Sequence, residues 1–540
     1  GLSSPEGHFR LPPPRNEPLE KLMYAIFSCA NWRWGHFQAY GAAARYDLDF
    51  TLHLGDFIYE NGLELYPNDE QAVRESLDPP HELFSLEDYR KRYALHRGDA
   101  NLQALSAAAP MIAIWDDHEV ANNAWKNGAA EHEAFDGTYG ARREAALRAY
   151  HEWMPTRIDL HARGEDLWMH SHRSFDFGNL AKLVALEMRH KGRDAQTALT
   201  RGSVSKQLAD VIHASGYPPK DKAHARFFDV MLRAVKSQVE AARRKPTREM
   251  LGFAQRSWVA EQARNFEADG QGWFLVMQPL VMQELLAADH LKAIQEAVRQ
   301  KNPDAADWIK QIESASGLQL TANGTIAAQR LQHHEMTDAH RKAQVDLVAG
   351  RHGIPLDFDS WNGYLAAKER LVGILETAGR GRSVVYGGDS HNAWAGAVLN
   401  RSGHGVAVEF DCQSVSSPGQ EFYRPWTTPE LEASAWRAAN PALAYTNVHQ
   451  RGFMVVELNQ TGHHVEFLAV NTTADASVKA ECISAFGVLS GHVGLHNATC
   501  RDAPPAFVGD DEEPPPREMV ECDFDQPEVT LSEPEEDEFE

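Results

Sequence analysis

The 540-residue sequence contains no long hydrophobic run. A membrane-spanning helix needs roughly 20 consecutive apolar residues. The nearest candidate, residues 273–288, is interrupted by Gln278-Pro279 and by Gln283-Glu284. We expect this segment to form a core strand followed by a helix, so the sequence predicts no transmembrane segment.

Several motifs of well-known enzyme classes are also missing. There is no Walker loop, no GxSxG elbow and no HxHxDH cluster, which disfavours NTPases, serine esterases and metallo-β-lactamase-like hydrolases. Basic residues are not in excess, because the formal net charge is −24. A protein that binds duplex nucleic acid would present a basic face, so this class is disfavoured as well.

Cysteine is scarce, and none of the five cysteines is part of a CxxC zinc pattern. Cys482 and Cys500 flank one C-terminal segment, and a disulfide between them would require an oxidising compartment. The spacing alone leaves the paired and the free forms open. The sequence starts at Gly1 without an initiator Met or an apolar signal segment, so we expect a trimmed start from which any export signal has been removed.

Composition divides the chain into a catalytic domain and flanking segments. The Ala-rich, charged stretches inside the domain have helical character and are interpreted as insertions. Residues 510–540 contain fifteen acidic residues and one Arg, and this composition predicts disorder. The predicted parts are a Pro-rich N-terminal stub at 1–20, the catalytic domain at 21–480 with helical insertions at about 203–244 and 287–341, a C-terminal extension at 481–508 and the acidic tail at 509–540.

Four short apolar runs are each followed at once by polar residues of the types that bind metals. These predicted strands are 24–28, 49–54, 110–115 and 383–386. In open α/β architectures, ligands collect where loops leave the carboxyl ends of strands. Four such junctions in one chain predict an α/β fold with one site built from these loops. Further strands of the same sheet system are expected at 406–410, 452–458 and 464–470, and helices at 35–44 and 142–153.

The second and third junctions carry the strongest chemical signal. Asp56 and Tyr59 offer a carboxylate and a phenol behind a turn-forming Gly, and a phenolate is a good ligand for a ferric ion; the alternative is a helix-capping Asp and a core Tyr. The segment 116–119 (Asp-Asp-His-Glu) places like charges side by side, which is costly in a buried position unless cations compensate them. An exposed acidic turn is the alternative there.

The first and fourth junctions are weak when taken alone. Asp389 and His391 form a common Asp-x-His pattern, and a buried free cysteine such as Cys29 is usually only a small apolar residue. Their value comes from the position that they share with the other junctions, at the end of an apolar strand. In that position a thiolate from Cys29 becomes a plausible ligand for iron.

Together these segments resemble the alkaline phosphatase D family of bacterial phosphatases, within the calcineurin-like metallophosphoesterases. The resemblance runs from residue 22 to about residue 470 in the order of the family. The matching segments are 28–29, 35–40, 53–60, 89–95, 115–123, 387–391, 416–419, 440–445 and 451–453.

The resemblance implies a four-layer α/β/β/α metallophosphoesterase sandwich with helical insertions. It also implies a ferric ion with divalent partners, calcium in the best-known form of the family, with zinc or manganese as alternatives. The implied metal ligands are Cys29, Asp56 as the bridging residue, Tyr59, Asp117 in place of the superfamily's Asn, Asp389 and His391.

The implied substrate contacts involve fewer residues. His118 would contact the phosphate or protonate the leaving oxygen, with Asp117 beside it in the catalytic motif. Arg90 or Arg92 would bind phosphate, because a guanidinium fork matches phosphate oxygens. Asn122 would add an amide oxygen, although a plain turn role is equally compatible with its position.

We therefore expect hydrolysis of phosphate esters by a metal-bound hydroxide, with phosphomonoesters, phosphodiesters or both as substrates. One alternative is a dedicated phosphodiesterase, of phospholipase D-like or teichoic-acid-cleaving type, that acts on a lipid or polymer. Another is a non-catalytic surface protein that binds metal or phosphate. The resemblance also implies export, to the periplasm or outside the cell. The family more often has Leu-Asp-Thr-Arg where residues 186–189 are Leu-Glu-Met-Arg, which bears on substrate preference.

Overall fold

The computed structural model describes residues 6–501, except 65, 69, 157–167, 170, 197–198, 332–334, 380 and 476–478. The predicted acidic tail at 509–540 lies outside the described residues. Within them, no helix is both long and apolar enough to cross a membrane.

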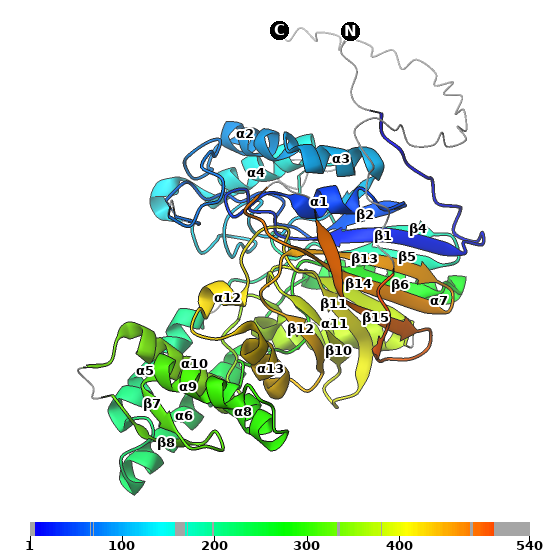
Figure 1. The fold of residues 1–540 in the computed structure, drawn as a ribbon. Coiled ribbons are helices and arrows are strands. Elements are labelled where there is room, and N and C mark those ends of the chain that lie inside the picture. The colour runs from blue at the N-terminus through cyan, green and yellow to red at the C-terminus, as the bar shows by residue number, and fades with distance from the viewer. Residues whose placement is uncertain are drawn as a thin grey trace, which may run out of the picture. The chain divides into compact units, whose positions relative to one another are not determined.

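Two seven-stranded mixed sheets and the helices around them give an α/β fold (Figure 1). The first sheet contains, in spatial order, β16 (His496–Asn497), β15 (Ala480–Leu489), β14 (Gly462–Val470), β13 (Gly452–Asn459), β1 (Lys21–Phe27), β2 (Phe50–His53) and β3 (Met111–Ala113). The second contains β12 (Leu443–Asn447), β10 (Ala393–Leu399), β11 (Gly405–Asp411), β9 (Ser383–Gly387), β6 (Trp273–Met277), β5 (Ala181–Ala185) and β4 (Arg173–Phe177). Parallel pairing joins β1, β2 and β3 in one sheet, and β5, β6, β9 and β11 in the other.

Strand β1 shows how the sequence pattern buries both faces of the first sheet. Successive side chains of a strand point to opposite faces. Tyr24 and Ile26 belong to an apolar cluster that also takes side chains from the second sheet, whereas Ala25 and Phe27 belong to a cluster shared with helices. A continuous apolar run is therefore required here, because neither face meets water.

Helices pack on both sheets through separate apolar clusters. The first sheet shares its cluster with α1 (Gln38–Ala43), α2 (Leu86–Arg97), α3 (Ala100–Ala108) and α4 (Tyr139–Trp153), and the second shares one with α7 (Gly252–Asp269), η4 (Trp361–Tyr364) and α11 (Leu365–Thr377). Local sequence sets where these helices begin. The Ser85 hydroxyl accepts from the backbone N–H of Asp88, whose carboxylate accepts from the N–H of Ser85, so a capping box starts α2.

The predicted insertions contribute to an apolar cluster of their own. It is built mainly from α5 (Arg201–Ser215), α6 (Lys222–Arg243), α8 (His290–Arg299), α9 (Ala305–Ser316), α10 (Asp338–Arg351) and α13 (Pro429–Ala439). The second insertion also contains a two-stranded sheet, β7 (Leu318–Leu320) and β8 (Ile326–Gln329), which the helical interpretation missed. The described residues also form the short elements η1 (Ala134–Asp136) and α12 (Gln420–Tyr423).

One sequence-based expectation about the fold differs from the structure. Residues 278–289 follow β6 without helical structure, and the next helix begins only at His290. The four junction strands belong to two sheets, because β1, β2 and β3 pair in one and β9 in the other. Strand β15 pairs with β14, so the first sheet continues into the predicted C-terminal extension, where a disulfide joins Cys482 to Cys500.

Candidate metal centre

The loops that leave β1, β2, β3 and β9 meet around one point. The backbone N–H of Cys29 donates to the carbonyl of Gly55 (3.1 Å), which ties the first junction to the second. The N–H of His118 donates to a carboxylate oxygen of Asp56 (3.3 Å), which ties the second junction to the third. The structure therefore brings together all four junctions that the sequence singled out.

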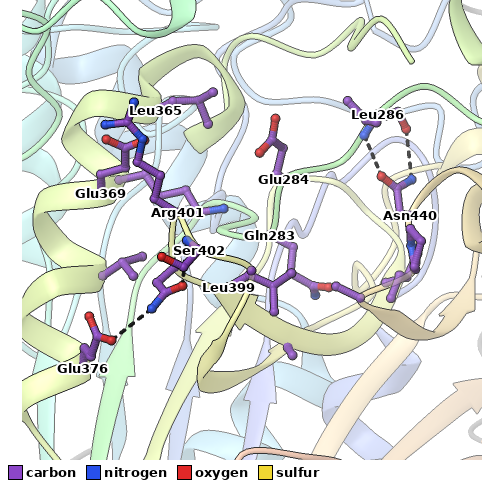
Figure 2. A pocket seen from close by; sticks show the side chains of 18 of the residues that line it. Gln283, Glu284, Leu286, Leu365, Glu369, Glu376, Leu399, Arg401, Ser402 and Asn440 are labelled. Atoms are coloured by element: carbon purple, nitrogen blue, oxygen red, sulfur yellow. Dashed lines mark hydrogen bonds between the residues drawn. The ribbon is translucent and has the colours of Figure 1, made fainter. Parts of the chain in front are cut away.

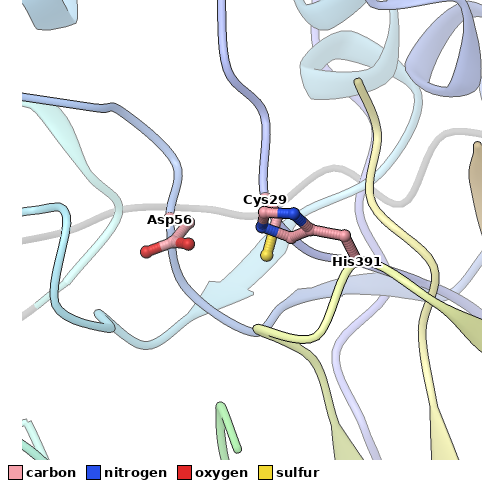
Figure 3. Close-up of side chains that lie close together, drawn as sticks. All are labelled: Cys29, Asp56 and His391. Atoms are coloured by element: carbon pink, nitrogen blue, oxygen red, sulfur yellow. The ribbon is translucent and has the colours of Figure 1, made fainter. Parts of the chain in front are cut away.

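Three groups of metal-type donor atoms lie here, and each group has its atoms within 4.8 Å of one another. The first is Cys29, Asp56 and His391, whose side chains lie close together in Figure 3. The second is Asp56, Asp117 and His118, and the third is Asp56, Asp116, Asp117 and Asp389. Asp56 belongs to all three groups, so it occupies the place that a bridging ligand needs.

Glycine allows the loops to approach this closely. A Cβ atom at Gly55 would lie 2.6 Å from the backbone nitrogen of Asp116, and Gly55 has a φ of +108°, which other residues rarely adopt. A Cβ atom at Gly388 would overlap the hydroxyl oxygen of Ser28. Any larger residue at either position would push two of the four junctions apart.

Left-handed backbone conformations are concentrated at the same place. Of the six non-glycine residues with positive φ in the described part of the chain, five are Cys29, Asp56, Asn123, Asp389 and His391. Such conformations are strained for residues with a Cβ atom and persist only where surrounding contacts enforce them. They aim the side chains of Cys29, Asp56, Asp389 and His391 into the cluster, which supports a functional role.

Hydrogen bonds orient the imidazole and the phenol of the cluster. Nδ1 of His391 lies 2.7 Å from the carbonyl oxygen of Pro418, so this nitrogen donates and Nε2 is left to face the cluster. The Tyr59 hydroxyl lies 3.3 Å from that Nε2 and donates to Asp56 (3.0 Å), and the Ser417 hydroxyl donates to it (2.8 Å). Tyr59 is thus placed with the other predicted ligands.

His118 is held by a buried carboxylate. Its Nδ1 lies 2.6 Å from Oε2 of Glu60, a fully buried residue. Burial would raise the pKa of Glu60, but the charge and hydrogen bond of His118 outweigh it and leave that pKa below its usual value. Burial would likewise lower the pKa of His118, but Glu60, Asp117 and Asp56 raise it well above its usual value. Glu60 therefore fixes Nδ1–H and leaves Nε2 of His118 for another partner.

Glu119 fastens the second junction to the third. Its carboxylate accepts from the backbone N–H groups of Asp56 (3.1 Å), Phe57 (2.6 Å) and Asp116 (2.7 Å). Burial raises the pKa of Glu119 to about 8, against the lowering effect of these hydrogen bonds. Its contacts are to backbone groups, so Glu119 acts on loop geometry.

Arg189 is the buried cation that contacts most of these carboxylates. Its guanidinium contacts Asp116, lies 2.6 Å from Asp359, and lies 3.5 and 3.6 Å from Asp117 and Asp389. No part of its side chain is exposed. Arg193, equally buried, also contacts Asp359. Two guanidiniums therefore face four carboxylates, which leaves excess negative charge in a buried place.

The pKa values of the carboxylates reflect this excess. Burial, with the charges of neighbouring carboxylates, raises the pKa of Asp56 and of Asp389 well above their usual range and that of Asp116 to about 6. Asp117 differs: burial would raise its pKa, but Arg189 and His118 lower it. Cations among these oxygens would remove the penalty, so the donor set fits a group of metal ions.

The predicted substrate-binding residues lie differently. Arg90 is partly exposed and pairs with Glu152 at 2.6 Å. Arg92 is buried and donates to the backbone carbonyls of Tyr59, Asn61, Asp78 and Pro79. The Asn122 side chain donates to Glu131 (2.7 Å), whereas its neighbour Asn123 donates its backbone N–H to Asp117 (2.6 Å). The structure gives these three side chains protein partners and does not place them in the donor groups.

Sequence reasoning missed several residues of the site. Glu60 and Ser417 belong to the matching segments 53–60 and 416–419, but neither was predicted to have a role in the site. Arg189 reaches the carboxylates only through the fold. Arg201, at the start of α5, lies over the ring of Tyr423 (5.6 Å). Burial raises the pKa of the Tyr423 hydroxyl, and the charges of Asp389 and His118 also affect this pKa. The ring therefore lies near the cluster. No signal in the sequence pointed to Arg201.

Two mixed sheets with a buried set of carboxylate, thiol and imidazole donors at their strand ends define an α/β protein with a candidate multi-metal centre. The chain belongs to the PhoD-like phosphatase family, whose model matches residues 24–467. The resemblance found in the motifs is thereby confirmed.

Two relatives illustrate the relationship. Alkaline phosphatase D of Bacillus subtilis (strain 168) is 27% identical over 451 residues, which cover 83% of this chain and 58% of that protein. The chain therefore spans little more than half the length of this curated relative. A solved structure described as "Structure of PhoD" matches with a TM-score of 0.61 and 22% identity, covering 91% of this chain and 74% of the other. At this identity the structural match shows the fold.

Proposed function

We propose that this protein hydrolyses phosphate esters with the help of metal ions held at the four strand ends. The observation that carries the proposal is the sharing of Asp56 by three donor groups, which together offer a site for more than one ion. Membership of the PhoD-like phosphatase family supports it. Bound metal ions supply Lewis acidity toward phosphoryl oxygens and lower the pKa of water.

The proposed ligands are Cys29, Asp56, Tyr59, Asp117, Asp389 and His391. We propose a ferric ion near Cys29 and Tyr59, because thiolate, phenolate and imidazole donors suit iron. The group built from carboxylates alone suits a hard divalent cation, for which we propose calcium, with zinc and manganese as alternatives. Elemental analysis of the purified protein separates these metals, and a visible absorption band that disappears in Tyr59→Phe would identify the iron–phenolate pair.

His118 is proposed as the residue that contacts the phosphate or donates a proton to the leaving oxygen. Glu60 holds Nδ1–H at 2.6 Å, so Nε2 is the nitrogen available to substrate. Asp117 lies beside it and accepts the backbone N–H of Asn123 at 2.6 Å, which fixes the carboxylate among the donors. His118→Asn should lower kcat strongly, and the metal content measured on the same sample separates this role from that of a ligand in the group with Asp56 and Asp117.

For the arginine that meets the substrate, we propose Arg201. It has no hydrogen bond or ion pair in the described part of the chain, and it lies over Tyr423 near the cluster. Arg90 and Arg92, the candidates from sequence, already have protein partners. Arg201→Met should raise KM for phosphate esters, with Arg90→Met as the matched control that leaves KM unchanged. The reverse result would return the role to Arg90.

The remaining proposals concern substrate, architecture and location. Phosphomonoesters and phosphodiesters both remain candidate substrates, and parallel assays on p-nitrophenyl phosphate and bis-p-nitrophenyl phosphate distinguish them. The apolar cluster between the sheets and the two clusters on their other faces support a four-layer α/β/β/α sandwich. The disulfide between Cys482 and Cys500 supports export to an oxidising compartment.

The decisive experiment is phosphoesterase activity before and after metal removal. We expect turnover of at least one of the two nitrophenyl esters, its loss after dialysis against a chelator, and its return with iron and a divalent cation. Asp56→Asn should abolish activity and metal retention together, because this carboxylate is common to the three groups. Full metal occupancy without turnover of any phosphate ester would instead support a non-catalytic binding protein.

A further inference from the structure

A pocket of about 740 Å³ is lined by none of the proposed metal ligands. It lies among helix α11, the hairpin between β10 and β11, the residues before β12 and the segment that follows β6 (Figure 2). Leu365, Val372 and Leu399 contribute apolar wall, and Gln283 and Lys368 contribute polar groups. This size and mixed lining are typical of small-molecule sites.

Lys368 is a buried cation without a close partner. Only 6% of it is exposed, and no carboxylate oxygen of the described residues lies within 4.0 Å of its ammonium. Burial lowers the pKa of Lys368 to about 8, although the charges of Glu284 and Glu409 oppose this effect. Because burial of an unpaired ammonium is costly, an anion bound in the pocket would stabilise it.

Gln283 is a second buried group without a side-chain partner. It is 3% exposed, and within the described chain neither its amide nitrogen nor its amide oxygen forms a hydrogen bond. Its backbone N–H donates to Glu409 (2.6 Å), which fixes the main chain at this point. Buried amides are nearly always hydrogen-bonded, so both atoms of this amide lack the partners that a buried amide normally has.

The acidic side chains of the lining already have partners. Glu284 pairs with Arg243 at 2.7 Å and Glu369 with Arg244 at 3.0 Å. Glu376 accepts a hydrogen bond from Asn400 at 3.0 Å, drawn as a dashed line in Figure 2. Arg401 adds a further lining cation, and it forms no ion pair or hydrogen bond with any described residue. The charged groups left without a partner here are therefore cations.

We propose that this pocket binds a small organic anion, whose carboxylate or phosphate group meets Lys368 and Gln283 and whose apolar body lies along Leu365, Val372 and Leu399. A lysine ammonium is a compact charge that suits either oxyanion. The Gln283 amide donates to the oxyanion through nitrogen and accepts through oxygen from any hydroxyl or amide of the ligand. The site is separate from the proposed metal centre, so the proposal stands independently of phosphoesterase activity.

Isothermal titration at pH 7 on the whole protein tests the ligand class. The probes are octanoate, octylphosphonate and, as a neutral match, octan-1-ol. We expect octanoate or octylphosphonate to bind at least about tenfold more tightly than octan-1-ol, because charge-assisted hydrogen bonds contribute most of the difference. Preference for one oxyanion identifies the head group. Equal affinity for the neutral alcohol, or no binding of any probe, would overturn the proposal.

Two variants locate the binding. Lys368→Met removes the charge but keeps an unbranched side chain, and should weaken binding about tenfold or more. Gly373 lines the pocket on α11, and a Cβ atom there meets nothing within 4 Å. Gly373→Leu should therefore fill the pocket and abolish binding without loss of the fold, whereas the control Gly373→Ala should retain it. Unchanged binding in both Lys368→Met and Gly373→Leu would refute the assignment, since octylphosphonate held only at the metal centre would give that result.

Discussion

Replacement of Arg189 by methionine tests whether one guanidinium balances the buried carboxylates. Arg189→Met keeps the length and apolar volume of the stem and deletes the only positive charge that contacts Asp116, Asp117 and Asp389 among the described residues. Its side chain is fully buried, so water cannot replace the lost contacts. Removal of one partner from a buried ion pair typically costs about 3–5 kcal/mol.

We therefore expect the free energy of unfolding to fall by about 3–5 kcal/mol in a chelator, measured by urea denaturation with fluorescence detection. The matched control is Arg90→Met, which removes the partly exposed contact with Glu152 and should leave the unfolding midpoint unchanged. Saturating iron and divalent cation should reduce the difference in unfolding free energy between Arg189→Met and the unmodified protein. Ions that bind only the folded state stabilise it, and here they also supply the missing positive charge.

The reasoning would be wrong if Arg189→Met lay within about 1 kcal/mol of the unmodified protein in the chelator. In that case the carboxylates would take up protons at little cost, and the guanidinium would not be needed to hold the strand ends together. If added metal does not reduce the loss of unfolding free energy in Arg189→Met, the carboxylates that Arg189 contacts do not bind the metal.

Three further changes test the surrounding structure. Gly55→Ala should destabilise the fold by about 1–3 kcal/mol or more in thermal unfolding, because φ is +108° and the new Cβ would meet Asp116. The control Gly140→Ala, with open space around the new Cβ, should be neutral or stabilising in the same measurement. Hydrogen bonds from His464 and Arg501 outweigh burial and lower the pKa of Glu466 to about 2. The contribution of Glu466 to stability is therefore present above about pH 4.5 and lost as pH falls toward 2. Glu466→Gln should flatten this part of a curve of unfolding free energy against pH. An unchanged curve between about pH 4.5 and 2 would show that Glu466 does not stabilise the fold in this way. Reduction of the Cys482–Cys500 disulfide, which closes a span of 18 residues, should lower the free energy of unfolding in urea by about 3 kcal/mol. An unfolding midpoint that does not change with reductant would show that this segment does not unfold with the rest of the protein.

The local elements of the core could be predicted from the sequence because their signals are local. Strand β1 is an uninterrupted apolar run since both of its faces are buried, and the polar residues that follow it mark its end. The donor residues Asp56, Asp117 and His391 were identifiable for the same reason, by chemical type and by position after a strand. The irregular segment 278–289 shows the limit of such signals, because apolar residues buried in a loop have the same composition as a core helix.

The sequence by itself determined which strand ends carry metal-type side chains and to which family the chain belongs, since short motifs with fixed spacing encode both. Only the tertiary structure decided that three of these strand ends come from one sheet and the fourth from another, so that Asp56 is shared by every donor group. It alone assigned Arg92 to backbone carbonyls, Arg189 to the carboxylates and Arg201 to the neighbourhood of Tyr423. Residue type fixes what an arginine can bind, but long-range packing fixes which carboxylate, carbonyl or ring it meets.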